Sequence, residues 1–304
     1  MVAYVFPGQG SQSVGMGQEY FDEFKDLTQV ADEILGYSIE KLCLEDPERK
    51  LNLTQYTQPA LYVVNAFAYL KKVQETGVHP EVVAGHSLGE YNALFAAGVY
   101  DFATGLKLVK KRGELMGRAK NGGMAAVLGM DEQAVGTVIE EKNLSAIDIA
   151  NLNSPEQTVI AGKKEDIEIA VKAFEDAGAI YVYRLNVSGA FHSRYMKEAQ
   201  KEFATYVDQF MFNAPEIICF SNVDGRPYKK ETLKDTLMRQ MTSSVRWTDI
   251  IRYIWGMDEK CEIVQVGPGR VLTDLTTKIK RTSTPFNIEE LKREENKQVQ
   301  ETFA

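Results

Sequence analysis

The feature that most constrains this chain is the pentapeptide Gly85-His86-Ser87-Leu88-Gly89. It follows a short apolar run, Val82-Val83-Ala84, and precedes a helix-like stretch from Glu90 to Ala97. A serine between two glycines in a strand–turn–helix context is typical of a nucleophile elbow, where a tight bend exposes the hydroxyl. A chance G-x-S-x-G pattern is the alternative. The correct flanking strand and helix favour the catalytic interpretation.

Strands and helices alternate on both sides of this elbow. Predicted strands cover 2–6, 82–84, 216–220 and 263–266, and predicted helices cover 18–36, 54–77, 90–97, 102–120, 192–211, 231–241, 247–257 and 271–280. Such alternation predicts a parallel sheet covered by helices on both faces. After Arg281 the chain is polar and charged, and we expect a loosely held tail there.

The pattern changes between residues 124 and 190. Predicted strands cover 124–130, 146–151, 157–161 and 180–185, predicted helices cover 131–142 and 164–178, and Asn153-Ser154-Pro155 is predicted to be a turn. The order β-α-β-β-α-β is that of a ferredoxin-like unit. We therefore predict an α/β protein with a large, discontinuous α/β-hydrolase-like catalytic domain, residues 1–123 and 191–304, and a small inserted ferredoxin-like domain, residues 124–190.

Composition excludes several classes of function. The net charge of −8 argues against a nucleic-acid partner. The three cysteines are widely spaced, so they form neither a metal-spaced pair nor a disulfide framework. No apolar run reaches the ~20 residues that a membrane span needs, and no signal peptide precedes the first strand. We expect a cytoplasmic protein with no membrane partner and no metal.

A serine nucleophile needs a neighbouring base, usually a histidine. The chain has only three histidines, His79, His86 and His192. His86 adjoins Ser87 on a sharp turn, so its side chain should point elsewhere, and His79 precedes a proline in a surface-like loop. His192 lies where the small domain ends and the large one resumes, which is where a cleft is expected. Elimination favours His192, against the alternative of a histidine that packs or caps at a helix start.

No aspartate stands out as a third member of a triad. A backbone carbonyl or an amide side chain can also orient an imidazole, and the residues alone leave that acceptor open. The loop Gly8-Gln9-Gly10 follows the first strand, but the next glycine is Gly15, so the dinucleotide-binding pattern G-x-G-x-x-G fails. The loop is either half of an oxyanion hole or a plain tight turn, and the motif does not separate the two.

Four motifs together resemble the malonyl-CoA:acyl carrier protein transacylases. They are Phe6-Pro7-Gly8-Gln9-Gly10-Ser11-Gln12, Gly85-His86-Ser87-Leu88-Gly89-Glu90-Tyr91, Arg112-Gly113 and Gly267-Pro268-Gly269, and the match covers about residues 1–281. The run from Ser188 to Met196 is most similar to discrete, trans-acting acyltransferases of polyketide synthases. Within it, Phe191-His192 resembles a malonyl-selecting signature.

The resemblance implies a role for each matching residue. Ser87 would carry the malonyl ester, and His192 would act as general base and then as general acid. Arg112 would pair with the malonyl carboxylate. The other implied roles are backbone amides of the oxyanion hole for Gln9 and Leu88, a backbone carbonyl that orients the histidine for Gln240, and substrate binding for Phe191 and Asn153.

The implied role of Arg112 agrees with its chemistry. A guanidinium is always charged and can bind a carboxylate through two hydrogen bonds, so it can select malonyl over a neutral acyl group. The alternative is a solvated basic face, because Lys107, Lys110, Lys111 and Arg118 are neighbours. Without the resemblance we would favour that alternative. With it, we favour the substrate role.

The resulting prediction is a ping-pong acyltransferase. It would take malonyl from malonyl-CoA, which is its substrate and not a cofactor, and pass it to the phosphopantetheine thiol of an acyl carrier protein or of a polyketide synthase carrier domain. We expect a monomer that needs no cofactor. The main alternative is an acyl hydrolase of the same fold that clears acyl groups from carriers, and a catalytically dead docking module is a weaker one. The sequence leaves the choice between fatty acid and polyketide synthesis open.

Overall fold

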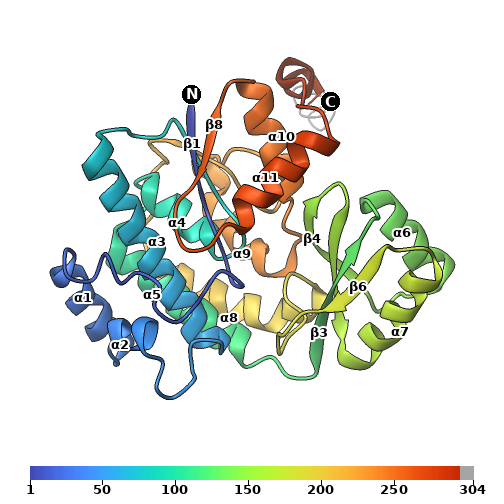
Figure 1. Cartoon of the computed structure of the whole chain (residues 1–304), viewed down its shortest axis with the longest axis horizontal. Coiled ribbons are helices and arrows are strands. Elements are labelled where there is room, and N and C mark those ends of the chain that lie inside the picture. The colour runs from blue at the N-terminus through green and yellow to red at the C-terminus, as the bar shows by residue number, and fades with distance from the viewer. Residues whose placement is uncertain (295–304) are drawn as a thin grey trace.

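The computed structural model describes residues 1–294 and contains two sheets (Figure 1). The first is parallel, in the order β7-β2-β1-β8, and consists of β1 (Val2–Phe6), β2 (Val82–Gly85), β7 (Ile218–Cys219) and β8 (Glu262–Gln265). The second is antiparallel, in the order β4-β5-β3-β6, and consists of β3 (Gly122–Leu128), β4 (Asp148–Ser154), β5 (Gln157–Lys163) and β6 (Tyr181–Arg184).

Helices surround both sheets. Those outside the antiparallel unit are α1 (Lys25–Leu35), α2 (Ile39–Leu44), α3 (Thr54–Thr76), α4 (Gly89–Ala96), α5 (Phe102–Gly117), α8 (Lys197–Val207), α9 (Leu233–Arg239), α10 (Trp247–Met257) and α11 (Val271–Thr282). Within the antiparallel unit lie α6 (Glu132–Glu141) and α7 (Lys164–Asp176). The predicted α/β fold with a parallel and a ferredoxin-like sheet is confirmed. The domain limits stay a prediction, and their last ten positions, 295–304, lie outside the described residues.

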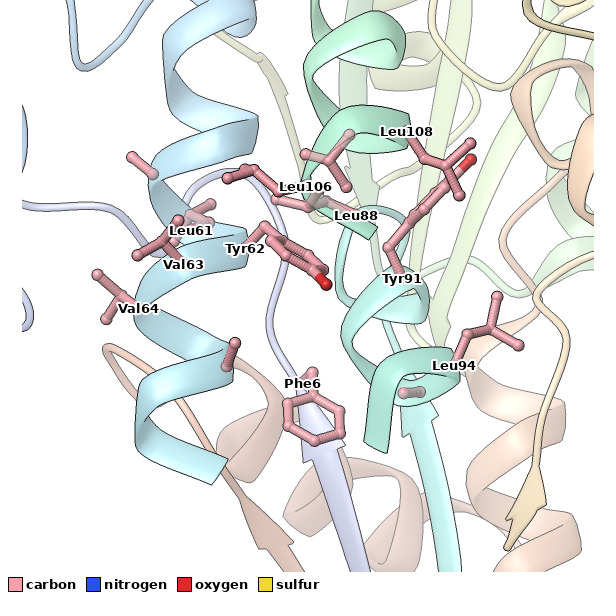
Figure 2. Close-up of a cluster of buried hydrophobic side chains, with 14 of the residues drawn as sticks. Phe6, Leu61, Tyr62, Val63, Val64, Leu88, Tyr91, Leu94, Leu106 and Leu108 are labelled. Atoms are coloured by element: carbon pink, nitrogen blue, oxygen red, sulfur yellow. The ribbon is translucent and has the colours of Figure 1, made fainter. Parts of the chain in front are cut away.

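The parallel sheet places the elbow. Every residue of β2 is buried, as expected of a central parallel strand that is covered on both faces. The pairing of Phe6 with Gly85 brings the end of β1, and the loop that follows it, next to the elbow. Figure 2 shows side chains from β1, α3, α4 and α5 packed together behind it, including Phe6, Tyr62 and Tyr91. The elbow therefore stands on a dense apolar base.

The two faces of the antiparallel sheet have different neighbours. Ala125 and Val127 of β3 share one apolar cluster with residues of α6 and α7, which lie on the side of this sheet away from the parallel one (Figure 1). The alternating residues Met124 and Ala126 belong to the larger core cluster instead. Because side chains alternate along a strand, one face is left to look towards the parallel-sheet unit.

Several predicted boundaries are wrong for local reasons. The first helix begins at Lys25 and not near residue 18, since the preceding residues form successive turns in which Gly15 and Gly17 take positive φ. Asn153 and Ser154 continue β4 and do not form a turn, because Ser154 pairs with Gln157 across a tight hairpin.

The predicted helix over 192–211 is interrupted at its start. His192 has φ of 56°, which an α-helix cannot hold, so a 3₁₀ turn, Arg194–Met196, precedes α8. The helix predicted over 231–241 is also divided, into the 3₁₀ turns Lys230–Thr232 and Gln240–Thr242 on either side of α9. The first of these interruptions contains His192, and the 3₁₀ turn after α9 contains Gln240.

The expected loose tail after Arg281 is wrong for residues 283–294, and the last ten positions of that tail, 295–304, lie outside the described residues. Phe286, Ile288 and Leu291 pack against the core cluster of α10 and α11. The Arg252 guanidinium lies 4.0 Å from the centre of the Phe286 ring, and the Phe286 amide donates to the Arg252 carbonyl at 3.1 Å. Apolar residues spaced along a polar segment anchor it.

Within residues 1–294, no helix is both long and apolar enough to cross a bilayer.

Substituting Gly85→Ala should unfold the elbow. A Cβ at Gly85 would lie 1.9 Å from the backbone carbon of Gly89, and neither backbone can withdraw without breaking β2 or α4. We expect a loss of at least about 3 kcal/mol in the free energy of unfolding, measured by urea denaturation. Gly136→Ala is the control, since a Cβ there meets nothing within 4 Å on α6. That variant should gain up to about 1 kcal/mol. Equal urea midpoints for Gly85→Ala and the parent protein would contradict this account.

Candidate active site

Ser87 lies at the strained turn between β2 and α4. Its φ is 52°, a left-handed conformation that non-glycine residues seldom adopt. Asn222, from the loop after β7, holds this turn: its Oδ1 accepts from the Ser87 amide at 2.7 Å, and its Nδ2 donates to the Gly85 carbonyl at 2.7 Å. Sequence reasoning missed this buried asparagine. Its place just after the predicted strand over 216–220 was the one available signal.

His192 lies within hydrogen-bonding distance of Ser87, although 105 residues separate them in the chain. The distance from Ser87 Oγ to His192 Nε2 is 2.7 Å, and that from His192 Nδ1 to the Gln240 carbonyl oxygen is 2.9 Å. Because a carbonyl can only accept, Nδ1 carries the proton in this arrangement, which leaves Nε2 free to take the serine proton. The structure therefore brings together the predicted nucleophile, base and orienting carbonyl.

The charge state of His192 suits a base. Burial, together with the positive charge of Arg112, lowers the pKa of His192 to about 3. The imidazole is therefore neutral at neutral pH, with its lone pair available. The other two histidines have different positions: His79 is exposed in a loop, and His86 lines the same cavity, with its Nε2 2.8 Å from Asn153 Oδ1.

Arg112 of α5 is fully buried beside the serine. Its Nη1 donates to Gln58 Oε1 at 2.7 Å, and its Nη2 donates to Gln240 Oε1 at 2.9 Å and to Ser87 Oγ at 3.1 Å. All three acceptors are neutral, and within residues 1–294 Arg112 forms no ion pair while its Nε has no partner. The solvated-face alternative is thus wrong for this arginine. A buried cation without a carboxylate partner can bind an anion next to the nucleophile.

Two backbone amides face the same place. The amides of Gln9 and Leu88 have no acceptor anywhere in the part of the chain that the structure describes, and both residues line the cavity over Ser87. The Gly8 loop touches the elbow, since a Cβ on Gly8 would lie 2.4 Å from the His86 carbonyl oxygen. Only a glycine allows this approach. Two free amides beside a nucleophile can stabilise the negative charge of a tetrahedral intermediate.

A cavity of about 500 Å³ opens above these groups, between the antiparallel sheet and the parallel-sheet unit. Phe191 and Asn153 line it as predicted, together with residues of β3, β5, β6 and α11. Gln240 lies behind this lining and reaches the site through Arg112 and His192. Asn151 also lines the cavity, and its buried Oδ1 has no partner among the described residues.

Sequence reasoning also missed Glu90. This residue of α4 is fully buried, and burial raises its pKa to about 7. Its sequence signals were its place in the motif around Ser87 and its being the one charged residue of α4. Among residues 1–294, no group of three or more histidine, cysteine, aspartate or glutamate side chains is arranged to hold a metal ion.

Comparisons with known proteins agree with this geometry. The acyl transferase domain family matches residues 3–293. The chain is 56% identical over 282 residues to the polyketide biosynthesis malonyl CoA-acyl carrier protein transacylase PksC of Bacillus subtilis (strain 168), covering 92% of this chain and 98% of that protein. It is also 56% identical over 287 residues to the polyketide biosynthesis protein PksE of the same strain, covering 94% of this chain but only 37% of that larger protein.

Solved structures share the whole fold. A malonyl CoA-acyl carrier protein transacylase from Burkholderia pseudomallei superposes with a TM-score of 0.90 at 45% identity, covering 93% of this chain and 99% of that one. The transacylase PlMCAT, solved in complex with the type II polyketide synthase acyl carrier protein AntF, superposes with a TM-score of 0.86 at 36% identity. That match covers 93% of this chain and 94% of the other.

The lowered pKa of His192 predicts how the reactivity of Ser87 in the substrate-free protein depends on pH. Protonation of His192 removes the base that activates Ser87. Because the pKa of His192 in the folded protein is about 3, the reactivity of Ser87 should be lost only near that acid pH. We expect the rate of labelling by a neutral fluorophosphonate to change by less than about twofold between pH 8 and pH 5, whereas an ordinary histidine would lose about 30-fold. His192→Ala should label at least about 100-fold more slowly throughout. A half-maximal rate near pH 6.5 would refute the expectation.

Proposed function

This chain belongs to the acyl transferase domain family, and on that premise we propose that it transfers malonyl from malonyl-CoA to an acyl carrier protein. The acyl group would pass through an ester on Ser87 to the phosphopantetheine thiol of the carrier. The observation that carries this proposal is the buried Arg112, whose Nη2 lies 3.1 Å from Ser87 Oγ without a carboxylate partner in residues 1–294. It supplies a cation where the malonyl carboxylate would lie.

The first half-reaction uses the groups around the elbow. As Ser87 Oγ attacks the thioester carbonyl, His192 Nε2 takes its proton, and the Gln240 carbonyl stabilises the imidazolium through Nδ1–H. The amides of Gln9 and Leu88 receive the developing oxyanion. Collapse of the intermediate breaks the carbon–sulfur bond, and His192 returns the proton to the CoA sulfur. Malonyl-Ser87 and free CoA result.

The second half-reaction reverses these roles. The carrier thiol enters the vacated cavity and loses its proton to His192 as the sulfur attacks the malonyl-Ser87 carbonyl. Collapse then breaks the ester bond, and His192 returns the proton to Ser87 Oγ. Malonyl thioester and free enzyme are formed, so atoms and charges balance without any further reactant. Water in place of the thiol would give the hydrolase reaction.

Selection of malonyl follows from burial of Arg112. A free carboxylate on the substrate satisfies the guanidinium, whereas acetyl leaves it buried with neutral partners only. Charge-assisted pairing of this kind is worth about 2–4 kcal/mol of discrimination. Phe191, 5% exposed, closes the cavity beside His192 and restricts larger acyl groups.

The pathway is the finer part of the proposal. PksC, whose name assigns it to polyketide biosynthesis, matches this chain over nearly the full length of both proteins. We therefore favour polyketide over fatty acid synthesis, with a discrete acyl carrier protein or a synthase carrier domain as the partner. The solved complex of PlMCAT with a polyketide synthase carrier protein supports this partner class. PksE is much longer than the matched part, so nothing is carried over from its remainder.

Replacing Arg112 with alanine should remove the preference for malonyl. We expect the rate of Ser87 malonylation to fall about 30- to 1,000-fold, which corresponds to about 2–4 kcal/mol, while acetylation changes little. Intact mass after mixing with malonyl-CoA or acetyl-CoA measures both adducts. Lys107→Ala is the matched control, because it removes an exposed cation from the same helix. It should load malonyl at the parent rate.

Adding a phosphopantetheinylated carrier protein to the malonyl adduct distinguishes transfer from hydrolysis. We expect the adduct mass to move to the carrier faster than it is lost to water. Ser87→Ala should form no adduct. Adduct lost to water at the same rate with and without carrier would favour the hydrolase, and an acetyl adduct without a malonyl adduct would overturn the role of Arg112.

A further inference from the structure

Glu90 is a buried carboxyl group that the reaction described above does not use. It lies in the first turn of α4, three residues after Ser87, and is fully excluded from solvent. Removing a carboxyl group from water is costly unless every oxygen finds a donor. Each carboxyl oxygen of Glu90 is therefore expected to have a hydrogen-bond donor nearby.

The partners of Glu90 are all donors. Oε1 accepts from the Asn222 amide at 3.2 Å and from the Tyr228 hydroxyl, and Oε2 accepts from Gln240 Nε2 at 2.7 Å. Asn222 is the residue that pins the elbow, and Gln240 is the residue whose carbonyl orients His192. Glu90 is thus bonded directly to two residues that shape the site.

Glu90 determines which way the Gln240 amide faces. Gln240 Nε2 donates one hydrogen to Glu90 and the other to the Ser87 carbonyl at 2.7 Å, so Oε1 is left to accept from Arg112 Nη2. The reversed amide would set Nε2 against the Arg112 donor, and Oε1 against two acceptors. Only one orientation of the Gln240 amide satisfies Glu90, the Ser87 carbonyl and Arg112 together.

We propose that Glu90 is a positioning residue that sets the selectivity for acyl groups bearing a carboxylate, and that it acts on Arg112 through the Gln240 amide. This inference rests on the proposed malonyl transfer. The Gln240 Oε1 accepts from the same Nη2 that donates to Ser87 Oγ, and it thereby holds this nitrogen at the serine. A carboxylate bonded directly to Arg112 would instead satisfy the cation and compete with the substrate.

Glu90→Gln tests this chain of contacts without changing the size of the side chain. The new amide nitrogen must face either Gln240 Nε2 or the Asn222 amide, so one donor always meets another donor. If it faces Gln240, that amide reverses and sets its NH₂ against Arg112. We expect the ratio of malonyl to acetyl loading of Ser87 to fall at least about tenfold, with fluorophosphonate labelling within about threefold of the parent.

Two other variants keep the test decisive. Tyr62→Phe removes a different buried hydroxyl, which donates to the Phe102 carbonyl at 3.2 Å, and should leave the selectivity ratio unchanged at a comparable loss of stability. Gln240→Met interrupts the same relay from its other end while keeping the backbone carbonyl. Its selectivity ratio should fall as in Glu90→Gln. Gln240→Met therefore serves as the test if Glu90→Gln does not fold.

The outcomes separate this inference from the proposed function. A parent protein that loads malonyl, with a Glu90→Gln variant of unchanged selectivity, overturns the inference alone. Equal losses of malonyl loading, acetyl loading and fluorophosphonate labelling show a merely structural residue and also overturn it. A parent protein that never forms the malonyl adduct overturns both. A selective loss of malonyl loading supports the positioning role.

Discussion

The interaction on which this structure depends is that of a buried guanidinium with neutral partners only. Arg112 is fully excluded from solvent, and its acceptors are two glutamine side chains and the serine hydroxyl. A buried cation is costly unless it is paired, so such a site is most stable when an anion enters it. This burial is the basis of the selectivity that we propose for the site. The neighbouring Gln240 accepts from Arg112 through Oε1 and donates to the buried Glu90 through Nε2.

Backbone strain is concentrated at the reacting groups. Ser87 and His192 both take positive φ, at 52° and 56°, although neither is a glycine. Strain of this kind costs about 1–3 kcal/mol per residue and persists where surrounding contacts enforce it. At Ser87 the enforcing contact is identifiable, because Asn222 bonds to the backbone on both sides of the turn. At His192, the Gln240 carbonyl orients the side-chain ring. The rigid elements thus carry the strain that exposes the hydroxyl and aims the imidazole.

Part of the candidate site could be predicted from the sequence, and part could not. The elbow around Ser87 was predicted because a strand, two glycines and a helix lie within a few residues. His192 followed because only three histidines compete. The predicted roles of Arg112 and Gln240 came from the family resemblance alone, since an arginine among lysines normally indicates a solvated face. Asn222 and Glu90 were missed because their partners lie more than 130 residues away.

Periodicity and neighbouring residues are enough to predict the alternation of strands and helices, the βαββαβ insertion and the turn that carries Ser87. The folded structure was needed to show which histidine, which carbonyl and which arginine lie at Ser87. It was also needed to show where the helices begin and where the final segment is anchored. The physical reason is that burial and hydrogen-bond satisfaction are properties of the assembled interior. Whether a guanidinium is solvated or buried depends on the solvent that the whole fold excludes, and no window of sequence contains that information.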